Sequence, residues 1–368
     1  NIHNNGISAI VVPTGIATDN TTSLFFSTLM EDGSIKSLND FVNEKMLFPS
    51  VLHNFHFSLF TITGRDKKNK SCQFSFNNQL IEHLKQDIRQ FSLTFKEIEA
   101  INPESKTLPV LTSKYDSTII LKVHNKINIL AKEGDFPDMW NPNLFSLFHM
   151  TNDSSIFQNQ DSNHLIPLYE AKMFYQYDHR YGTYNPESDE RLHMLPKTEL
   201  YNYIKPEFRV VSSFYVPKIE VENRVKDNWK YKWFLAFRGI SSGQLERTFT
   251  ATIIPYSGVG NSSILVNPIG SNSINVGLLL SGFNSIPFDY ITRQKAAGAN
   301  LNFFKVRQLP VPSPKKLHGF TIVIMPKVLE LTYTSWDIKS FADDVWKEAD
   351  EELKAAIQKH WNENQAVT

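Results

Sequence analysis

The sequence contains a single cysteine, Cys72, among 368 residues. One cysteine excludes a disulfide within the chain and any zinc site that is built from several cysteines. No apolar run reaches the roughly 18 residues needed to span a bilayer. No signal peptide opens the chain, which starts at Asn1 without Met and runs into an apolar segment. These absences predict a cytoplasmic protein with no membrane contact, and a piece of a longer one.

Net charge is lacking as well, because 38 basic residues balance 38 acidic ones. A small dedicated DNA-binding domain would be strongly basic, so the total argues against nucleic acid. The distribution argues for it. The stretch from Arg293 to Lys316 carries six basic residues and no acid, whereas the stretch from Asp337 to Glu363 carries eight acids and four bases. Since a ligand contacts one face, local charge matters more than the sum.

Several widespread sequence motifs are missing. There is no P-loop and no dinucleotide fingerprint, which counts against common nucleotide-binding enzymes. The eleven histidines show no metal-ligand spacing; His53 and His56 are close, but a third ligand is not in view. No metal site is therefore expected among the histidines.

Aromatic residues are abundant, with 27 Phe, 13 Tyr and 6 Trp. Rings of this kind usually fill large cores, and they sometimes form platforms on which bases stack. The chain is long enough for two or three domains with cores of their own. We therefore assign most of the rings to cores.

The first 77 residues have the pattern of an open α/β sheet. Residues 7–15 form a short apolar run that predicts a buried parallel strand, and residues 19–30 predict a helix. Residues 34–42 and 55–63 predict two further strands. A hydrophilic turn then leads to residues 72–76, which alternate as the return strand of a hairpin would.

Residues 78–135 have a helical pattern instead. Residues 78–90 are amphipathic, residues 94–101 start with a helix-capping residue, and residues 116–123 predict a third helix. We interpret this stretch as a helical connector.

Residues 136–325 have α+β texture with a large β component. Short apolar runs that alternate with Gly, Pro and Asn turns predict strands, namely 208–216, 233–237, 248–254 and 263–266. Residues 276–283 and 289–297 predict helices, and beyond residue 326 the chain turns helical, with an acidic amphipathic stretch over 338–358. The expected fold class is α/β plus α+β.

A series of short motifs follows in a fixed order along the chain: Ile-Val-Val-Pro-Thr-Gly-Ile-Ala-Thr-Asp at 10–19, Leu-Phe-Pro-Ser at 47–50, Phe-His-Met-Thr-Asn-Asp-Ser at 148–154, Tyr-Asp-His-Arg-Tyr-Gly-Thr-Tyr at 177–184, and Gln-Leu-Pro-Val-Pro at 308–312. Their combination resembles Eco57I-like adenine-N6 DNA methyltransferases of type IIG restriction-modification or phage-defence systems. The last segment is also similar to the target-recognition domains of type I specificity subunits.

The resemblance implies a division of the chain. Residues 1–77 would be the late strands of a truncated methyltransferase sheet and 78–135 the helical connector. Residues 136–325 would be the β-rich target-recognition domain, and 326–368 would be C-terminal helices packed on it. The chain would read a sequence in double-stranded DNA for a missing N-terminal catalytic half.

Two family motifs have no counterpart in this sequence. One is the Gly-containing turn that binds the cofactor, and the other is the Asn-Pro-Pro-Tyr/Phe motif that holds the target amino group. Asn102-Pro103 and Asn141-Pro142 lack the second proline and follow no strand. S-adenosylmethionine would therefore belong to the parent enzyme, and this chain is expected to contain no catalytic residue and to be inactive alone.

One candidate residue concerns the flipped base. Phe48 matches an aromatic that packs against the extruded adenine in related methyltransferases, where a ring replaces the lost stacking. The alternative is a core phenylalanine at the start of a strand.

The other candidates concern contact with the DNA duplex. Arginine matches the donors to guanine O6 and N7, which makes Arg180, with Tyr184 nearby, a candidate base reader; Asp178 could equally pair with it. Strand-end residues are candidates for phosphate contact, or for a solvated salt-bridge face: Arg238, Arg247 and Thr248. A basic cluster flanks Gly298 and is the strongest candidate region for DNA contact: Arg293, Lys295, Asn300, Lys305 and Arg307.

Two other functions stay open. Asp153, Glu170 and Lys172 follow the residue order of a Mg²⁺-dependent nuclease, although this pattern arises often by chance. The chain could also be a protein-interaction module of a defence complex, in which case the acidic C-terminal helices would be the contact. Binding to DNA that weakens with salt would favour recognition over both.

Overall fold

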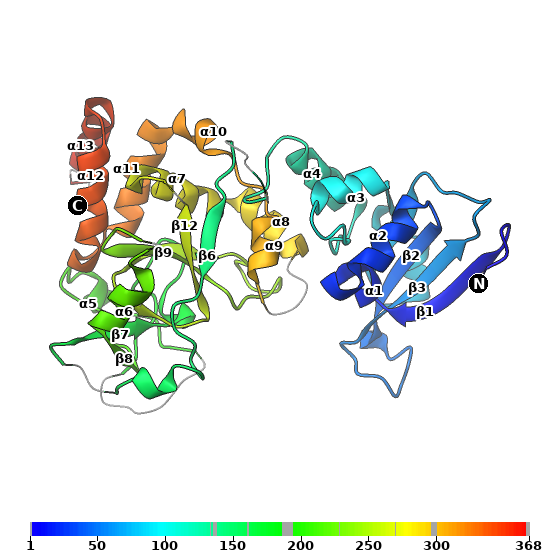
Figure 1. Cartoon of the computed structure of the whole chain (residues 1–368), viewed down its shortest axis with the longest axis horizontal. Coiled ribbons are helices and arrows are strands. Elements are labelled where there is room, and N and C mark those ends of the chain that lie inside the picture. The colour runs from blue at the N-terminus through cyan, green and yellow to red at the C-terminus, as the bar shows by residue number, and fades with distance from the viewer. Residues whose placement is uncertain are drawn as a thin grey trace. The chain divides into compact units, whose positions relative to one another are not determined.

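A computed structural model of the chain describes residues 2–132, 134, 138–159, 162–185, 194–227, 229–268, 270–295 and 300–365. The chain divides into two compact units, residues 1–128 and 129–368 (Figure 1). Across the described ranges it combines three β-sheets with helices in a mixed α/β fold that ends in helices. The expected mixture of α and β structure is confirmed, whereas the borders of the four predicted segments stay predictions.

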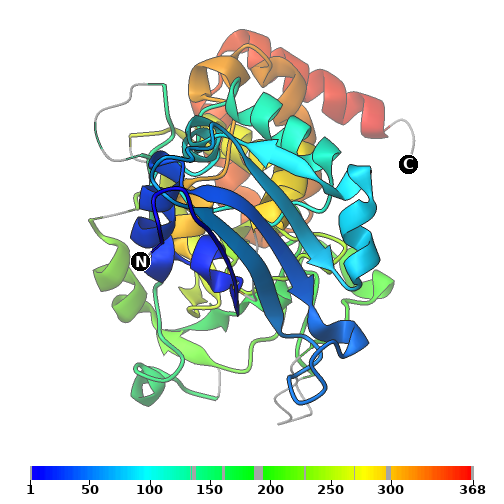
Figure 2. The same cartoon turned by 90° about the vertical axis from the view of Figure 1, so that its right-hand side faces the viewer.

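The first unit is built on a five-stranded mixed sheet with the order β1-β3-β2-β4-β5, whose strands run side by side in Figure 2. Alternating apolar residues form the strands, and one side chain in two points into the core. The strands are β1 (Ile7–Pro13), β2 (Ile35–Val42), β3 (His56–Thr63), β4 (Cys72–Asn78) and β5 (Phe91–Leu93).

Helices α1 (Gly15–Thr18) and α2 (Ser23–Glu31) follow β1, and α3 (Phe95–Ile101) and α4 (Lys114–His124) follow β5. Helix α2 buries Phe26 and Met30, and the Met30 sulfur lies 3.3 Å from the Cys72 sulfur on β4. Helix α3 begins with a capping box, since Thr94 accepts from the Glu97 amide while Glu97 accepts from the Thr94 amide. The helices predicted over 94–101 and 116–123 are confirmed.

Two strand predictions in this unit are wrong in their pairing. Strand β1 is antiparallel to β3, lies at the edge of the sheet and exposes much of its apolar sequence, so it is not a buried parallel strand. Strand β4 pairs in parallel with β2 and does not return along β3 as a hairpin. Apolar runs locate strands, but they do not determine which neighbour a strand pairs with.

The helix predicted over 78–90 is also wrong. Two short 3-10 helices, Ile81–Lys85 and Asp87–Arg89, take its place. Ile81 and Ile88 are exposed, so the apolar stripe of the sequence finds no surface to cover. Without such burial a short amphipathic helix is only marginally stable.

The second unit contains two sheets. One has the order β10-β9-β12-β6, and the other has the order β11-β7-β8. The first comprises β6 (Pro142–Phe145), β9 (Trp233–Arg238), β10 (Ala251–Pro255) and β12 (Ser263–Pro268); the second comprises β7 (Leu165–Tyr169), β8 (Tyr215–Pro217) and β11 (Gly258–Val259).

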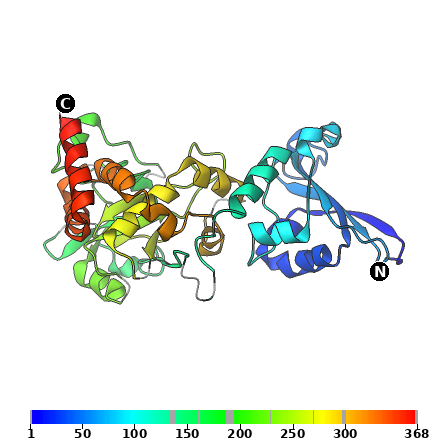
Figure 3. The same ribbon diagram turned by 90° about the horizontal axis from the view of Figure 1, so that it is seen from above.

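Helices cover the four-stranded sheet in successive layers (Figures 1 and 3). Helix α7 (Ser273–Phe283) is apolar nearly all round and almost wholly buried, between the sheet and helices α11 and α12. The remaining helices are α5 (Leu200–Tyr203), α6 (Lys218–Val225), α8 (Ile286–Lys295), α9 (Phe303–Arg307), α10 (Pro314–His318), α11 (Thr321–Thr332), α12 (Lys339–Glu348) and α13 (Glu351–Gln365). In the described ranges, none of the helices could cross a membrane.

The predicted elements of this unit are confirmed in part. The strands at 233–237 and 263–266 and the helix at 276–283 are present. The strand predicted over 208–216 shrinks to β8, and the helix predicted over 338–358 is two helices with a break at Ala349. The end of the helix predicted over 289–297 lies outside the described residues.

Candidate nucleic-acid interface

The main candidate site is a pocket of about 990 Å³ in the second unit. Segments that are far apart in the sequence line it, and four of them contribute the charged and amide side chains. They are the turn after β7, with Glu170 and Lys172; the end of β9, with Arg238; the turn before β12, with Asn261; and the start of α9, with Asn300. The pocket thus brings together Arg238 and Asn300, which the sequence proposed separately.

Glu170, Lys172 and Tyr184 form one polar cluster at this pocket. The Tyr184 hydroxyl donates to Glu170 Oε1 at 2.6 Å, and Lys172 Nζ lies 3.3 Å from Glu170 Oε2. The Lys172 ammonium also lies 5.0 Å from the centre of the Tyr184 ring, within cation–π range. Tyr184 is buried, so it positions Glu170 and Lys172 and offers no surface of its own to a ligand.

Arg238 supplies a second cation at the pocket wall. Its guanidinium donates through Nε to the Phe174 carbonyl at 2.8 Å and stacks near the rings of Tyr175 and Tyr181. Burial lowers the pKa of Arg238 from its ordinary value. One edge of this residue still lines the pocket. Arg238 therefore remains a candidate for contact with an anion.

The start of α9 forms the exposed lip of the pocket. Asn302 caps the helix, because its side-chain oxygen accepts from the Lys305 amide at 3.0 Å. Asn300 is exposed, and its carbonyl lies 3.5 Å from Lys305 Nζ. Arg307, one turn further, lines a neighbouring pocket of about 350 Å³ together with Lys132. Gly298, which the sequence placed at the centre of this cluster, lies outside the described residues.

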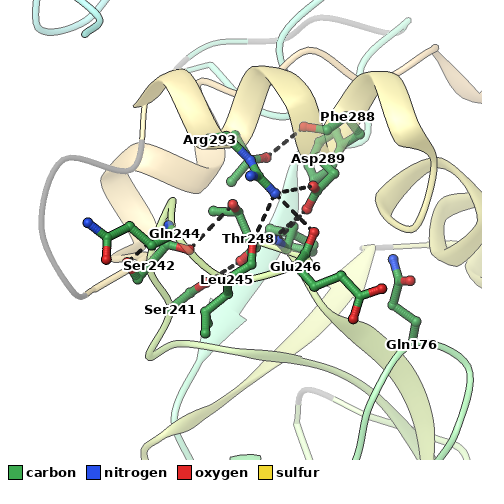
Figure 4. A network of polar contacts seen from close by, with 12 residues as sticks. Gln176, Ser241, Ser242, Gln244, Leu245, Glu246, Thr248, Phe288, Asp289 and Arg293 are labelled. Carbon is green, nitrogen blue, oxygen red and sulfur yellow. Dashed lines mark hydrogen bonds and ion pairs between the residues drawn. The ribbon is translucent and has the colours of Figure 1, made fainter. Parts of the chain in front are cut away.

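Arg293 and Thr248 belong to a polar network that ties the loop after β9 to helix α8 (Figure 4). Asp289 accepts from the amides of Thr248 and Phe249, both at 2.8 Å. Arg293 donates to the carbonyls of Leu245 and Glu246, each at 3.0 Å. Thr248 is buried, so it does not reach a phosphate in this conformation, and both side chains hold the loop in place.

Arg247 lies on the same loop and is partly exposed. Its charge acts on Tyr175 and Tyr177 by lowering the pKa of both hydroxyls, although burial, the larger effect, leaves both values raised. Within the described residues it has no hydrogen bond or ion pair, which leaves its guanidinium available to a ligand.

Lys295 and Arg180 are buried, contrary to the exposure that DNA contact requires. Lys295 Nζ donates to the Gln308 carbonyl at 2.7 Å, and burial lowers its pKa well below the ordinary value. Arg180 is 1% exposed and donates to three backbone carbonyls. In this conformation neither side chain reaches a base or a phosphate.

Asp153, the first carboxylate of the nuclease hypothesis, is paired with an arginine. Both oxygens of Asp153 accept from the guanidinium of Arg224, at 2.9 and 3.2 Å, and this hydrogen bonding lowers the pKa of Asp153. Glu170 is held by Tyr184 and Lys172. Among the described residues no group of three or more His, Cys, Asp or Glu side chains could hold a metal ion. The three residues are thus occupied in other contacts.

Phe48 lies in the first unit, on the loop between β2 and β3, and is 44% exposed. Its ring meets Phe57 edge to face at 4.9 Å, which leaves the other side of the ring open. The buried Asn43 holds the loop: its amide donates to the carbonyls of Phe48 and Val51, and its oxygen accepts from the Phe48 amide. Phe48 is therefore not a core residue, and its loop is held in place by Asn43.

Replacing Asn43 by alanine should loosen this loop and lower the unfolding free energy of residues 1–128 by about 1–3 kcal/mol, because three backbone groups lose their partner. Amide hydrogen exchange should speed up over residues 46–55 and stay unchanged in α3. The exposed Asn54→Ala change on the same loop is the matched control. Equal protection of residues 46–55 in both variants would contradict the assigned role of Asn43.

Sequence reasoning missed Asn261 and Asn302 at the main pocket. Asn302 carries a recognisable signal, since an asparagine before an apolar run is typical of a helix cap. Asn261 carries none, because it joins the pocket only through the pairing of β12 with β9. Its side-chain oxygen accepts from the Met150 amide at 3.2 Å.

No protein-family model matches the sequence, and no curated protein matches it either. Among solved structures the chain is similar to the type IIL restriction-modification enzyme MmeI, determined in complex with DNA, with 11% identity and a TM-score of 0.43 over 97% of this chain and 46% of that one. It is also similar to the type IIG restriction endonuclease BpuSI, with 12% identity and a TM-score of 0.30 over 95% of this chain and 48% of that one. The chain spans about half the length of these two enzymes.

Proposed function

We propose that this chain recognises a specific sequence in double-stranded DNA, as the target-recognition part of an adenine-N6 DNA methyltransferase. The observation that carries the proposal is the pocket in the second unit, where two cations and three asparagines converge from four segments. Asparagine amides pair with adenine N6 and N7, while lysine and arginine neutralise phosphates. The sequence motifs that resemble adenine methyltransferases supply the reaction context.

The residues of the site differ in how exposed their side chains are, and we propose their roles accordingly. Asn300 is exposed at the lip, so its amide is the best candidate for reading a base edge. Lys305 and Arg307 on α9 and Arg247 on the loop after β9 are partly exposed and suit phosphate contact, which fixes register without reading sequence. The side-chain oxygen of Asn302 caps α9, so this residue positions the lip.

The ring of Phe48 is proposed to line one side of the pocket that holds the extruded adenine. Support comes from its exposed ring and from the Asn43 clamp that holds it. Such a pocket needs an aromatic face that compensates for the unstacked base. The residues that would hold S-adenosylmethionine are not found in this sequence, so no residue of this chain is assigned to the cofactor.

The test begins with selection of the preferred sequence from random duplexes by the full chain, followed by fluorescence anisotropy at several salt concentrations. A double variant, Lys305→Gln with Arg307→Gln, should weaken binding at least about tenfold and reduce the slope of log affinity against log salt by about two. Asn300→Ala should instead relax the selected sequence at one position, with a loss of about 1–3 kcal/mol against the preferred base.

Lys347→Gln is the matched control, because Lys347 is an exposed lysine on α12, outside the residues that line the pocket. It should leave affinity and salt slope unchanged. Binding that does not fall with salt, or an equal loss in the control and in the double variant, would refute DNA recognition by this site.

A further inference from the structure

The C-terminal helices expose three tryptophans. Trp336, Trp346 and Trp361 are 56%, 45% and 55% exposed. The other three tryptophans of the chain, Trp140, Trp229 and Trp233, are buried. Burying a large ring is strongly favourable, so several half-exposed tryptophans in one short stretch indicate a surface that another molecule covers.

Two of these rings line a groove of about 500 Å³ between helices α11, α12 and α13. Trp346 comes from α12, Trp361 from α13, and Tyr333 follows α11. Trp336 meets the Tyr333 ring edge to face, with 6.2 Å between the ring centres, and extends the aromatic surface beyond the groove. The same helices can be located in Figure 1 beside the C-terminus.

Apart from His360, the titratable side chains with a charge near neutral pH that line the described part of the groove are acidic. Among the described residues that line it, Glu330 and Asp343 carry carboxylates, and there is no lysine or arginine. Glu330 is paired with His360 and Asn364, and Asp343 is paired with Lys339. Lys339 and Asp343 are both largely exposed, and an exposed pair of this kind contributes little to stability. A cation from another molecule can therefore replace Lys339 at low cost.

We propose that this groove, lined by Tyr333, Trp346, Trp361, Glu330 and Asp343, binds a lysine- or arginine-bearing segment of a partner protein. Aromatic faces attract ammonium and guanidinium groups, and the carboxylates add charge complementarity. Tryptophan and tyrosine are also the residues that dominate binding energy in protein interfaces. Phosphates would be repelled by the two acids, so the groove is distinct from the proposed DNA site.

The experiment uses the full chain and two synthetic amphipathic peptides of about 15 residues, one built from Leu and Lys and the other from Leu and Glu in the same pattern. The basic peptide should bind and shift tryptophan emission, whereas the acidic peptide should not bind. Trp361→Ala and Trp346→Ala should each lower the affinity for the basic peptide by about tenfold. Trp361→Phe should retain most of that affinity. Glu330→Gln should weaken it by a few fold.

Ile219→Ala, which truncates an exposed apolar residue on α6, is the matched control and should leave peptide binding unchanged. Far-ultraviolet circular dichroism checks that each variant is folded. Equal binding of both peptides, or basic-peptide binding that survives in both tryptophan variants, would overturn the proposal. So would a concentration-dependent dimer that Trp361→Ala abolishes, because the occupant would then be a second copy of the chain. DNA affinity should be unaffected by Trp361→Ala, which keeps this test separate from the proposed DNA site.

Discussion

Arg180→Met should lower the unfolding free energy of residues 129–368 by about 3 kcal/mol, because it removes a buried cation that serves three backbone carbonyls. Nη1 donates to the Lys205 carbonyl at 3.1 Å, and Nη2 donates to those of Tyr203 and Thr334 at 3.2 and 2.8 Å. The guanidinium also lies over the Tyr203 ring at 5.3 Å. Methionine fills a similar volume but leaves these carbonyls without their donor.

Chemical denaturation followed by tryptophan fluorescence measures this loss, since all six tryptophans lie in the second unit. Arg209→Met is the matched control: Arg209 is exposed, so the change should stay within about 0.5 kcal/mol. A fully stable Arg180→Met variant with reduced DNA affinity would reverse our conclusion and restore Arg180 as a base reader.

The neighbouring His179 makes the same connection to the C-terminal helices. Its Nε2 lies 2.9 Å from the Ser335 hydroxyl and 2.9 Å from Asp337 Oδ1. His179 and Arg180 thus join the turn at 334–337 to the segment that the sequence placed in a DNA-reading motif. Two consecutive polar residues with this many long-range partners indicate a structural role for that motif.

Asp289→Ala should lower the unfolding free energy of residues 129–368 by about 2–4 kcal/mol. The carboxylate is buried, and without it the two backbone amides that donate to it would lose their acceptor. It should also release the loop of residues 241–248, which follows the pocket-lining residues 238–240 in the chain (Figure 4). We therefore expect faster amide exchange at Thr248 and Phe249, together with weaker DNA binding.

Arg293→Gln is the comparison that distinguishes the amide contacts of Asp289 from the contacts that Arg293 makes. The Arg293 side chain is 38% exposed and lies 3.5 Å from Asp289 Oδ2, so the loss should stay below about 1 kcal/mol. If Arg293→Gln destabilised the unit as much as Asp289→Ala, the contacts of Arg293, namely its ion pair and its hydrogen bonds to the carbonyls of the loop, and not the amide contacts of Asp289 would hold the loop. If it weakened DNA binding without any loss of stability, Arg293 would be a phosphate contact after all.

The sequence by itself determined the local elements of this protein. The cap at Thr94, the apolar all-round pattern of 273–283 and the alternating runs of β2 and β3 each act within a few residues, so they can be read without the fold. The sequence also located the acidic, amphipathic C-terminal helices and proposed Asn300 and Lys305 for the same site.

The tertiary structure alone decided strand pairing and the fate of the polar residues. β4 pairs with β2 and not with β3, which the local alternation of β4 does not determine, since strand order depends on how the whole sheet packs. Arg180, Thr248 and Lys295 looked like surface residues, yet each is buried against a carbonyl or carboxylate that is distant in sequence. A polar side chain carries the same letter whether it meets solvent or satisfies a buried backbone group. Only long-range packing distinguishes the two, since burial of a polar group is tolerated only where a partner is supplied.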